Sequence, residues 1–252
     1  MIAVQNLVKK YGPFTAVDNV SLEVPSGQIH GFLGPNGAGK TTTLRMIAGL
    51  LKPTSGCVLV NGHDLTLEPE AAKMSLGFIP DRPFIYEKLT GGEFLRFHGG
   101  LYGIDGDAGR GDVGSRAREM LELFELSRWE HELVESFSHG MKQRLVMSAA
   151  FLHRPRAVVV DEPMVGLDPR GARLIKDVFR RMSERGVAIL MSTHTLEVAQ
   201  EMCDRITIIN KGRIVASGTV DELRLMTGDD QLTAVFLKLT GGSGLQEIDE
   251  VI

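Results

Sequence analysis

The sequence predicts an α/β fold in which most strands lie parallel in one sheet. Short runs rich in β-branched residues alternate with longer segments whose apolar residues recur at helical spacing. One run, residues 29–33, leads into a glycine-rich turn, and a helical pattern over residues 41–51 follows that turn. The order strand, loop, helix is typical of a parallel sheet that is covered by its crossover helices.

Two more groups of strands are expected. The first group extends the core and ends in a hairpin whose turn is residues 210–212. The second group forms a small antiparallel β-subdomain, in which Val20, Leu22 and Val24 alternate with polar residues. The expected core strands are residues 157–160, 187–191, 206–209 and 213–216, and the strands of the subdomain are residues 2–7, 19–24 and 57–60.

The middle of the chain has a helical pattern, which is broken at residues 103–114 by a stretch rich in Gly and Asp that predicts a loop. We therefore expect an inserted α-helical subdomain at about residues 84–153, within a domain that spans residues 1–218. Residues 219–252 are expected to form a short C-terminal tail. Its first part is helical, and its order is expected to fade at the glycines of residues 241–244.

The composition argues against several classes of function. With 43% hydrophobic residues, 24% charged residues and a net charge of −4, the chain of 252 residues is typical of a globular protein without the basic surface of a nucleic-acid-binding protein. Cys57 and Cys203 have no metal-ligand spacing and are expected to be free thiols. No apolar run reaches the roughly 20 residues that cross a bilayer, and no secretory leader is evident. A transport pore would therefore belong to another chain.

The glycine-rich turn after the first core strand fits the pattern G-x-x-x-x-G-K-[ST] of a phosphate-binding loop. Its glycines allow consecutive backbone N–H groups to face phosphate oxygens, and the positive end of the following helix points at them. Lys40 would reach the β- and γ-phosphates, and the Thr41 hydroxyl would ligate Mg²⁺. The residues expected to bind a nucleoside triphosphate here are Asn36, Gly37, Ala38, Gly39, Lys40, Thr41 and Thr42.

An apolar strand that ends in two carboxylates gives a second indication. Asp161 can hold a water on Mg²⁺, and Glu162 can orient the attacking water. Taken alone, such a strand end is equally consistent with solvated surface carboxylates. Its presence in a chain that also carries the phosphate loop favours the catalytic interpretation.

Further motifs follow in an order that one protein family shares. Residues 137–141 read Phe-Ser-His-Gly-Met, residues 166–169 read Gly-Leu-Asp-Pro, His194 follows a predicted core strand, and Tyr11 precedes the β-subdomain. With these motifs the chain resembles the ATP-binding subunits of ABC transporters over nearly its whole length. The resemblance identifies the phosphate loop as Walker A, residues 158–162 as Walker B, and the other motifs as the signature, the D-loop, the switch histidine and the aromatic residue that stacks on adenine.

Each of these further elements also has an ordinary structural alternative. Taken alone, a residue such as Tyr11 is more often a surface-packing residue, and one such as His194 is more often a hydrogen-bonded histidine at a strand end. Ser138 alone is a good helix N-cap. For Ser138, a role as helix N-cap is compatible with a role in phosphate binding, because the N-terminus of a helix also binds anions. The order of all the motifs along one chain favours the family resemblance.

Two motifs depart from the family pattern. In the signature, His139 and Met141 replace Gly and Gln, whereas Ser138 and Gly140 are kept. Asp81 stands where the family usually has the glutamine of its Q-loop; its carboxylate can ligate Mg²⁺, but it lacks the amide donor. Asp81 is alternatively a turn residue after a proline. Both departures, with the segments at residues 86–91, 138–143 and 235–241, resemble the bacterial two-component group that exports drugs, antibiotics, sodium or other cargo.

The resemblance implies an ATPase that binds ATP and Mg²⁺ and works as a head-to-tail dimer of identical or paralogous chains. It also implies a separate membrane-spanning permease subunit, a peripheral location on the cytoplasmic face of the inner membrane, and no nucleic-acid partner. The catalytic residues would be Lys40, Glu162 and His194; nucleotide would contact Tyr11, the loop from Asn36 to Thr42, Asp81, Ser138, Gly140, Asp161 and Asp168; and Mg²⁺ would contact Thr41, Asp81 and Asp161.

Two other classes of protein fit the sequence less well. ABC ATPases of DNA repair and chromosome structure need long coiled coils or zinc cysteines between their motifs, and those of translation carry two ATPase halves, whereas this sequence has neither feature. An unrelated P-loop kinase or GTPase would leave Ser138, Asp168 and His194 together unexplained. Transport is therefore the favoured function.

Overall fold

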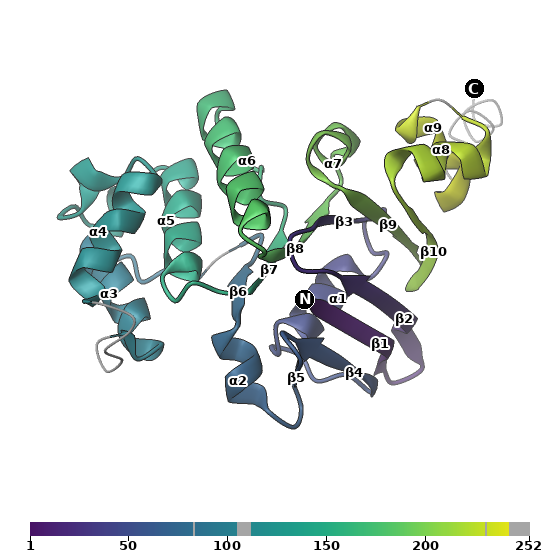
Figure 1. Ribbon diagram of the computed structural model, residues 1–252, viewed down its shortest axis with the longest axis horizontal. Helices are drawn as coiled ribbons and strands as arrows, with labels where there is room; N and C mark the ends of the chain where they lie inside the picture. Colours follow the sequence, from purple (N-terminus) through teal and green to yellow (C-terminus); the bar gives the residue numbers. More distant parts are fainter. Residues whose placement is uncertain (83, 105–111, 230, 242–252) are drawn as a thin grey trace.

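The strands that lead to the phosphate loop and to the paired carboxylates lie in one sheet (Figure 1). The computed structural model describes residues 1–82, 84–104, 112–229 and 231–241. The strand order of this larger sheet is β10-β9-β3-β8-β7-β6, in which β9 to β6 are mutually parallel and β10 is antiparallel. The mostly parallel sheet that the sequence predicts is confirmed. Its strands are β3 (Ile29–Leu33), β6 (Leu76–Ile79), β7 (Ala157–Asp161), β8 (Ala188–Thr193), β9 (Arg205–Asn210) and β10 (Arg213–Gly218).

The parallel register brings the carboxyl ends of the central strands to one edge of the sheet. Leu33 at the end of β3 pairs with Thr193 of β8, and Asp161 at the end of β7 pairs with Ser192 of β8. Every residue of β3, β7 and β8 is buried, as expected for strands that are covered on both faces. The polar residues that end or follow these strands therefore meet at this edge.

The smaller sheet confirms the predicted antiparallel β-subdomain. Its order is β2-β1-β4-β5, and all its pairings are antiparallel. Val20 of β2 and Phe32 of β3 belong to the same buried cluster as Leu44 of the helix that follows the phosphate loop, so this sheet packs beside that helix. The strands are β1 (Ile2–Tyr11), β2 (Phe14–Val24), β4 (Ser55–Val60) and β5 (His63–Asp64).

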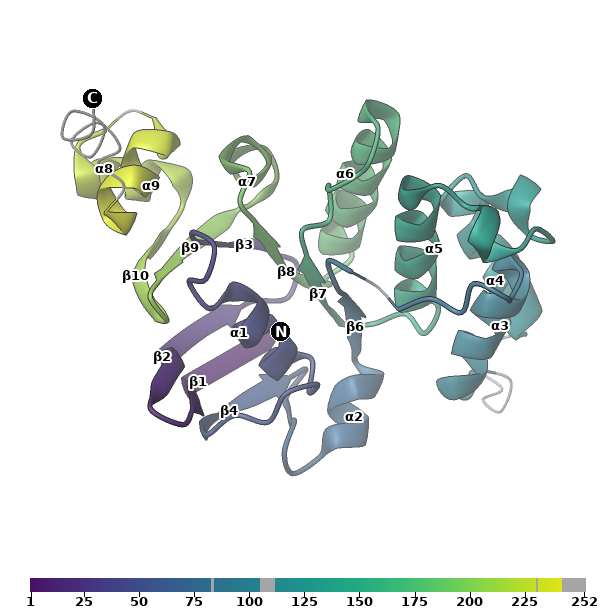
Figure 2. The ribbon, with the colours of Figure 1, turned by 180° about the vertical axis from the view of Figure 1, so that it is seen from behind.

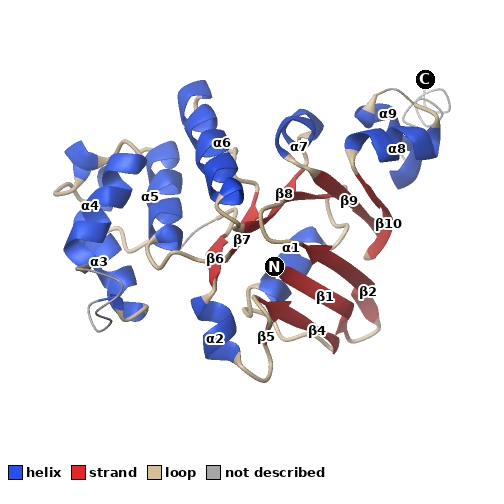
Figure 3. Cartoon of the chain, viewed as in Figure 1, coloured by secondary structure: helices blue, strands red, loops and turns tan. Residues whose placement is uncertain are grey.

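The helices occupy distinct parts of the molecule. Figures 1 and 2 show α3, α4 and α5 at one end of the molecule and α8 and α9 at the other end. Figure 3 shows helices and loops at the first end and strands in the middle. None of the described helices is both long and apolar enough to cross a bilayer. The helices are α1 (Lys40–Ile47), α2 (Pro69–Met74), α3 (Gly91–Leu101), α4 (Val113–Leu123), α5 (His139–Phe151), α6 (Pro169–Glu184), α7 (Leu196–Met202), α8 (Val220–Thr227) and α9 (Leu232–Thr240).

Some boundaries differ from the predicted ones. The helix predicted over residues 41–51 ends at Ile47, because Gly49 adopts a left-handed conformation with φ +67°. The loop predicted up to residue 114 ends earlier, since the Asp112 carboxylate caps α4 by accepting from the Ser115 N–H at 2.7 Å. The rest of that loop, residues 105–111, and the glycines after residue 241 lie outside the described residues. The division into subdomain and tail stays a prediction.

The hairpin turn and the cysteines agree with the sequence-based expectation. Arg213 pairs with Asn210 across the turn, and Lys211 and Gly212 have φ values of +47° and +80°. Positive φ at both central residues is the geometry that matches the twist of a two-residue hairpin. Cys57 and Cys203 are free thiols.

A buried histidine lies in the strand that leads to the phosphate loop. His30 is 2% exposed, its Nε2 lies 2.8 Å from the Thr207 hydroxyl, and its Nδ1 has no hydrogen-bond partner among the described residues. Burial, with a smaller contribution from the positive charge of Arg205, lowers the pKa of His30 to about 4. The core therefore holds this imidazole in its neutral form.

We predict that acid weakens the fold through His30. An unfolded chain binds a proton there below the ordinary pKa of 6.5, whereas the folded chain binds it only below about 4. The free energy of unfolding should therefore fall as the pH falls through this window, by about 2 kcal/mol at pH 5 from this residue alone. Urea unfolding at pH 7 and pH 5 should show this extra loss in the wild type and not in His30→Gln. An equal loss in both proteins would contradict the assignment.

Candidate functional site

The loop between β3 and α1 has the backbone conformation of a phosphate cradle. Gly37 and Gly39 have φ values of +78° and +105°, in the region that favours glycine. A side chain at Gly39 would place its Cβ 2.7 Å from the Ala16 carbonyl oxygen of β2, so this position cannot carry one without rearrangement. The space around Gly37 is open within 4 Å. The loop is thus fixed against the small sheet on one side and open on the other.

Lys40, the first residue of α1, is buried within this loop. It is 8% exposed, and its Nζ donates to the carbonyl oxygens of Gly34 at 2.6 Å and Pro35 at 3.1 Å. Burial lowers the pKa of Lys40, while the carboxylates of Glu162 and Asp161 act in the opposite direction. A desolvated ammonium beside an open glycine loop is suited to bind phosphate oxygens, because an anion there would neutralise its charge and accept its remaining hydrogen bond.

Asp161 joins the phosphate-loop helix to the neighbouring strands. The Thr41 hydroxyl donates to its Oδ2 at 3.0 Å, and the Ser192 hydroxyl donates to its Oδ1. A carboxylate and a hydroxyl are oxygen donors that suit Mg²⁺, which binds through one or two carboxylates and substrate phosphates. The described residues contain no cluster of three or more His, Cys, Asp or Glu side chains that could hold a metal alone. The donor set thus fits a cation that is held jointly with a phosphate.

Glu162 follows Asp161 in a conformation that is uncommon for its residue type. Its φ is +52°, and its N–H faces the backbone and side-chain oxygens of Ser192 at 3.2 and 3.3 Å. Its carboxylate Oε1 lies 2.9 Å from Nδ1 of His194, and because a carboxylate can only accept, Nδ1 carries the hydrogen. The Glu162 side chain is 15% exposed and that of His194 63% exposed. Ser192 therefore fixes the backbone of Glu162, and His194 orients its carboxylate.

Ser138 and Asp168 are the N-cap residues of α5 and α6. The Ser138 hydroxyl caps α5 by accepting from the Met141 N–H at 3.3 Å, and the Asp168 carboxylate caps α6 by accepting from the Gly171 N–H at 2.8 Å. The helix N-cap alternative for Ser138 is confirmed. Residues 166–167 contact the start of α5, since a Cβ at Gly140 would lie 3.3 Å from the Gly166 carbonyl oxygen.

Comparison with known proteins gives the family. Residues 17–165 match the family model described as ABC transporter. The chain is 38% identical to the daunorubicin resistance ATP-binding protein DrrA3 of Streptomyces coeruleorubidus over 93% of this chain and 73% of that protein. The chain belongs to the ABC transporter family. It is an ATP-binding ATPase of that family, as the sequence predicts.

Solved structures agree with this ABC fold. An ATP-binding subunit of an ABC transporter superimposes with a TM-score of 0.87 and 32% identity, over 95% of this chain and 99% of that one. A dimeric post-hydrolysis state of the ATP-binding cassette MJ0796 bound to ADP and Pi superimposes with a TM-score of 0.78 and 25% identity, over 87% of this chain and 99% of that one. The predicted α/β ATPase fold is confirmed by these neighbours.

The ABC motifs of this chain fall into two groups of contacts. The first, which we call the phosphate group, contains Lys40, Thr41, Asp161, Glu162 and His194. The second, which we call the signature group, contains residues 138–140 and the D-loop segment 166–168. Within the described part of the chain, no hydrogen bond or ion pair joins a member of one group to a member of the other.

Among the described residues, no hydrogen bond or ion pair joins Tyr11 or Asp81 to either group. Tyr11, at the end of β1, is 49% exposed, and the Lys9 ammonium lies 5.1 Å from the centroid of its ring. Asp81 follows β6, which β7 and β8 separate from β3 in the sheet. Its Oδ2 lies 3.9 Å from Nε of the neighbouring Arg82. The roles in adenine stacking and metal binding that the resemblance assigns to Tyr11 and Asp81 stay predictions, as do the individual roles of the other site residues.

Ser192 is a site residue that lies outside the predicted set. It contacts both Asp161 and Glu162 from the adjacent strand β8. Its signal in the sequence is the Ser-Thr-His run at the end of a buried strand. That signal becomes specific only once β8 is known to pair with β7.

We predict that Lys40→Met separates stability from function. The substitution removes a desolvated ammonium and keeps an apolar stem of similar length, so the urea midpoint of unfolding should stay level or rise. The affinity for ATP should fall about tenfold to a hundredfold, because charge-assisted contacts with phosphate are lost. Lys10→Met, at an exposed position of β1, is the matched control and should leave both quantities unchanged. Unaltered ATP affinity in Lys40→Met would remove Lys40 from the site.

Proposed function

We propose that this chain is one half of a head-to-tail dimer that closes on two ATP molecules and drives export through a separate membrane-spanning subunit. One observation carries the proposal: the signature helix α5 and the phosphate-loop helix α1 lie in different parts of the same molecule. Figures 1 and 2 both show α5 at one end of the molecule and α1 in the middle, with β6 and β7 between them. The N-terminus of α5 is therefore free to serve a phosphate on a second chain.

The signature group is built to receive an anion. The first turn of α5 contains no acidic residue, so the positive end of the helix is not neutralised locally. Ser138 is exposed, and Gly140 is half-buried and carries no side chain of its own. These groups would approach the γ-phosphate held by the phosphate group of the opposite chain. The dimeric MJ0796 cassette supports such an arrangement by its similarity.

Hydrolysis would depend on residues that are already oriented within one chain. The Glu162 carboxylate would accept a proton from the attacking water, while His194 holds that carboxylate from the side exposed to solvent. Lys40 would offset negative charge on the transferred phosphoryl group. Thr41 and Asp161 would hold Mg²⁺, which when bound neutralises charge on the phosphates. Closure by the second chain would exclude water and complete the site.

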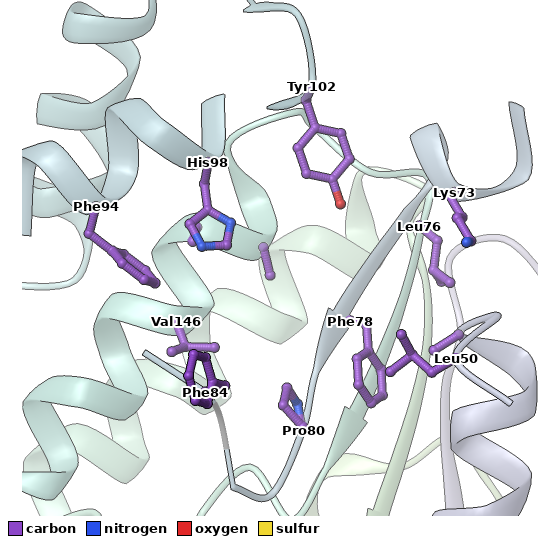
Figure 4. Close-up of a pocket in the computed structure, with 13 residues that line it drawn as sticks. Leu50, Lys73, Leu76, Phe78, Pro80, Phe84, Phe94, His98, Tyr102 and Val146 are labelled. Atoms are coloured by element: carbon purple, nitrogen blue, oxygen red, sulfur yellow. The ribbon is translucent and has the colours of Figure 1, made fainter. Parts of the chain in front are cut away.

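The membrane partner would bind beside Asp81. An apolar groove of about 310 Å³ lies between the helical end and the sheet, lined by residues such as Phe78, Phe84, Phe94 and His98 (Figure 4). Phe84 is 87% exposed, so the rim of this groove presents a large apolar side chain. Docking of a permease segment there would hold the chain at the cytoplasmic face of the inner membrane.

One ion pair connects this surface to the signature helix, and a second connects it to the turn that precedes this helix. Glu87, three residues beyond Phe84, pairs with Lys142 of α5 at 2.6 Å, and Lys88 pairs with Glu135 at 2.6 Å. Movement at the docking surface would therefore displace the first turn of α5. Export, in preference to import, is proposed because the related DrrA3 carries the name of a drug-resistance protein. The second chain of the dimer would be identical or a paralogue.

We predict that Glu162→Gln traps the closed dimer. The amide keeps the shape of the side chain but cannot accept a proton, so turnover should fall by about 10²–10⁴ while ATP binding persists. Light scattering after size-exclusion chromatography should show a dimer with ATP and Mg²⁺ and a monomer with ADP. Glu184→Gln, at an exposed position near the end of α6, is the control and should hydrolyse ATP as the wild type does.

The same variant tests the membrane partner. Tagged Glu162→Gln chain, purified with ATP from detergent-solubilised membranes of its own host, should bring down a multi-span protein. A variant that stays monomeric with ATP would contradict the dimer, and a dimer that recovers no spanning protein would contradict the transport partner.

A further inference from the structure

The imidazole of His139 lies directly on the α-carbon of Gly166. A Cβ built on Gly166 would come 2.1 Å from Cδ2 and 2.7 Å from Nε2 of this ring, so the ring occupies the space of the missing side chain. Gly166 also has φ +75°, in the left-handed region. Both the backbone conformation and the ring thus require glycine at this position of the D-loop.

A second contact fixes the same two segments to each other. The Cβ position of Gly140 lies 3.3 Å from the Gly166 carbonyl oxygen and 3.6 Å from Cδ2 of Leu167. The start of α5 and the D-loop therefore meet closely at their backbones, and the His139 ring packs against Gly166 at this contact. An unbranched planar ring with two rotatable bonds holds such a contact at little entropic cost.

The D-loop leads directly back to the carboxylate of the phosphate group. The Val165 N–H donates to the Glu162 carbonyl oxygen at 3.3 Å, and the Leu167 N–H donates to that of Met164 at 3.4 Å. Residues 162–167 consequently form consecutive tight turns. These turns begin at Glu162 and include Gly166, on which the His139 ring packs. A shift of Glu162 on binding or releasing phosphate would move Gly166, and with it the ring that rests on Gly166.

We infer that His139 is a positioning residue that couples the two ATP sites of the dimer. This inference rests on the proposed function, in which the signature of one chain serves the phosphate group of the other. Through Gly166, the state of Glu162 in one site sets the position of Ser138 and Gly140 in the opposite site. The coupling acts by packing of the ring and requires no proton transfer by the imidazole.

The first test compares His139→Ala with His139→Phe, which keeps a ring and loses the nitrogens. The wild type should show a sigmoidal dependence of turnover on ATP. His139→Ala should lower the Hill coefficient to about 1 and reduce kcat about tenfold to a hundredfold, because a loosened signature misplaces its contacts, with KM changed less than kcat. His139→Phe should keep the Hill coefficient and the wild-type pH profile. His131→Ala, at an exposed position near the helical end, should behave as the wild type.

The second test uses the space that the ring fills. Gly166→Ala alone should reduce turnover severely, since its methyl group meets the ring. Removing the ring in the double variant His139→Ala/Gly166→Ala should restore part of that loss, so that the double variant exceeds Gly166→Ala. A double variant slower than Gly166→Ala would overturn the contact.

Other outcomes separate the inference from the function on which it rests. Unchanged cooperativity in His139→Ala, a non-sigmoidal wild type, or loss of cooperativity and an altered pH profile in His139→Phe would overturn the coupling by packing. In each case the ATP-dependent dimer of Glu162→Gln would still stand. A Glu162→Gln chain that fails to dimerise overturns the proposed function itself.

Discussion

The parallel register of β3, β7 and β8 is the constraint on which the site depends. It sets Leu33 beside Thr193 and Asp161 beside Ser192, so the segments that follow three separate strands start from one edge. A slip by one residue would turn Asp161 to the opposite face of the sheet and break its hydrogen bonds with Thr41 and Ser192. The complete burial of these strands opposes such a slip, because each position is matched to a packed core.

Two features of the site that this register builds lower the stability of the fold. Lys40 is an ammonium in a desolvated loop, and Glu162 adopts a left-handed backbone that glycine would tolerate better. The surrounding strands supply the stability that allows these features to persist. Such local costs are common where a fold must hold groups ready for a charged substrate.

The sequence predicts the local parts of this site and misses the parts that depend on pairing. The phosphate loop and the strand that ends at Asp161 are visible because each is a continuous pattern. Ser192 is not, because its role exists only when β8 lies beside β7. The contact between His139 and Gly166 likewise joins residues from separate segments, and the sequence marks only the departure of His139 from the family motif. β6 is missed because it is short, and the start of α4 because its glycine-rich surroundings conceal the cap at Asp112.

The central claim is that an ATP site is completed by two chains, and chemical cross-linking tests it most directly. Asn36→Cys and Ser138→Cys chains, each in a Cys57→Ser, Glu162→Gln background, are mixed with ATP and Mg²⁺ and treated with a short thiol-reactive cross-linker. Asn36 and Ser138 are both exposed in the single chain, and Cys203 is buried. The account predicts a covalent dimer in the mixture with ATP, and none from either chain alone or with ADP. A single chain carrying both new cysteines that cross-links within itself, while the mixture gives no covalent dimer, would contradict the account.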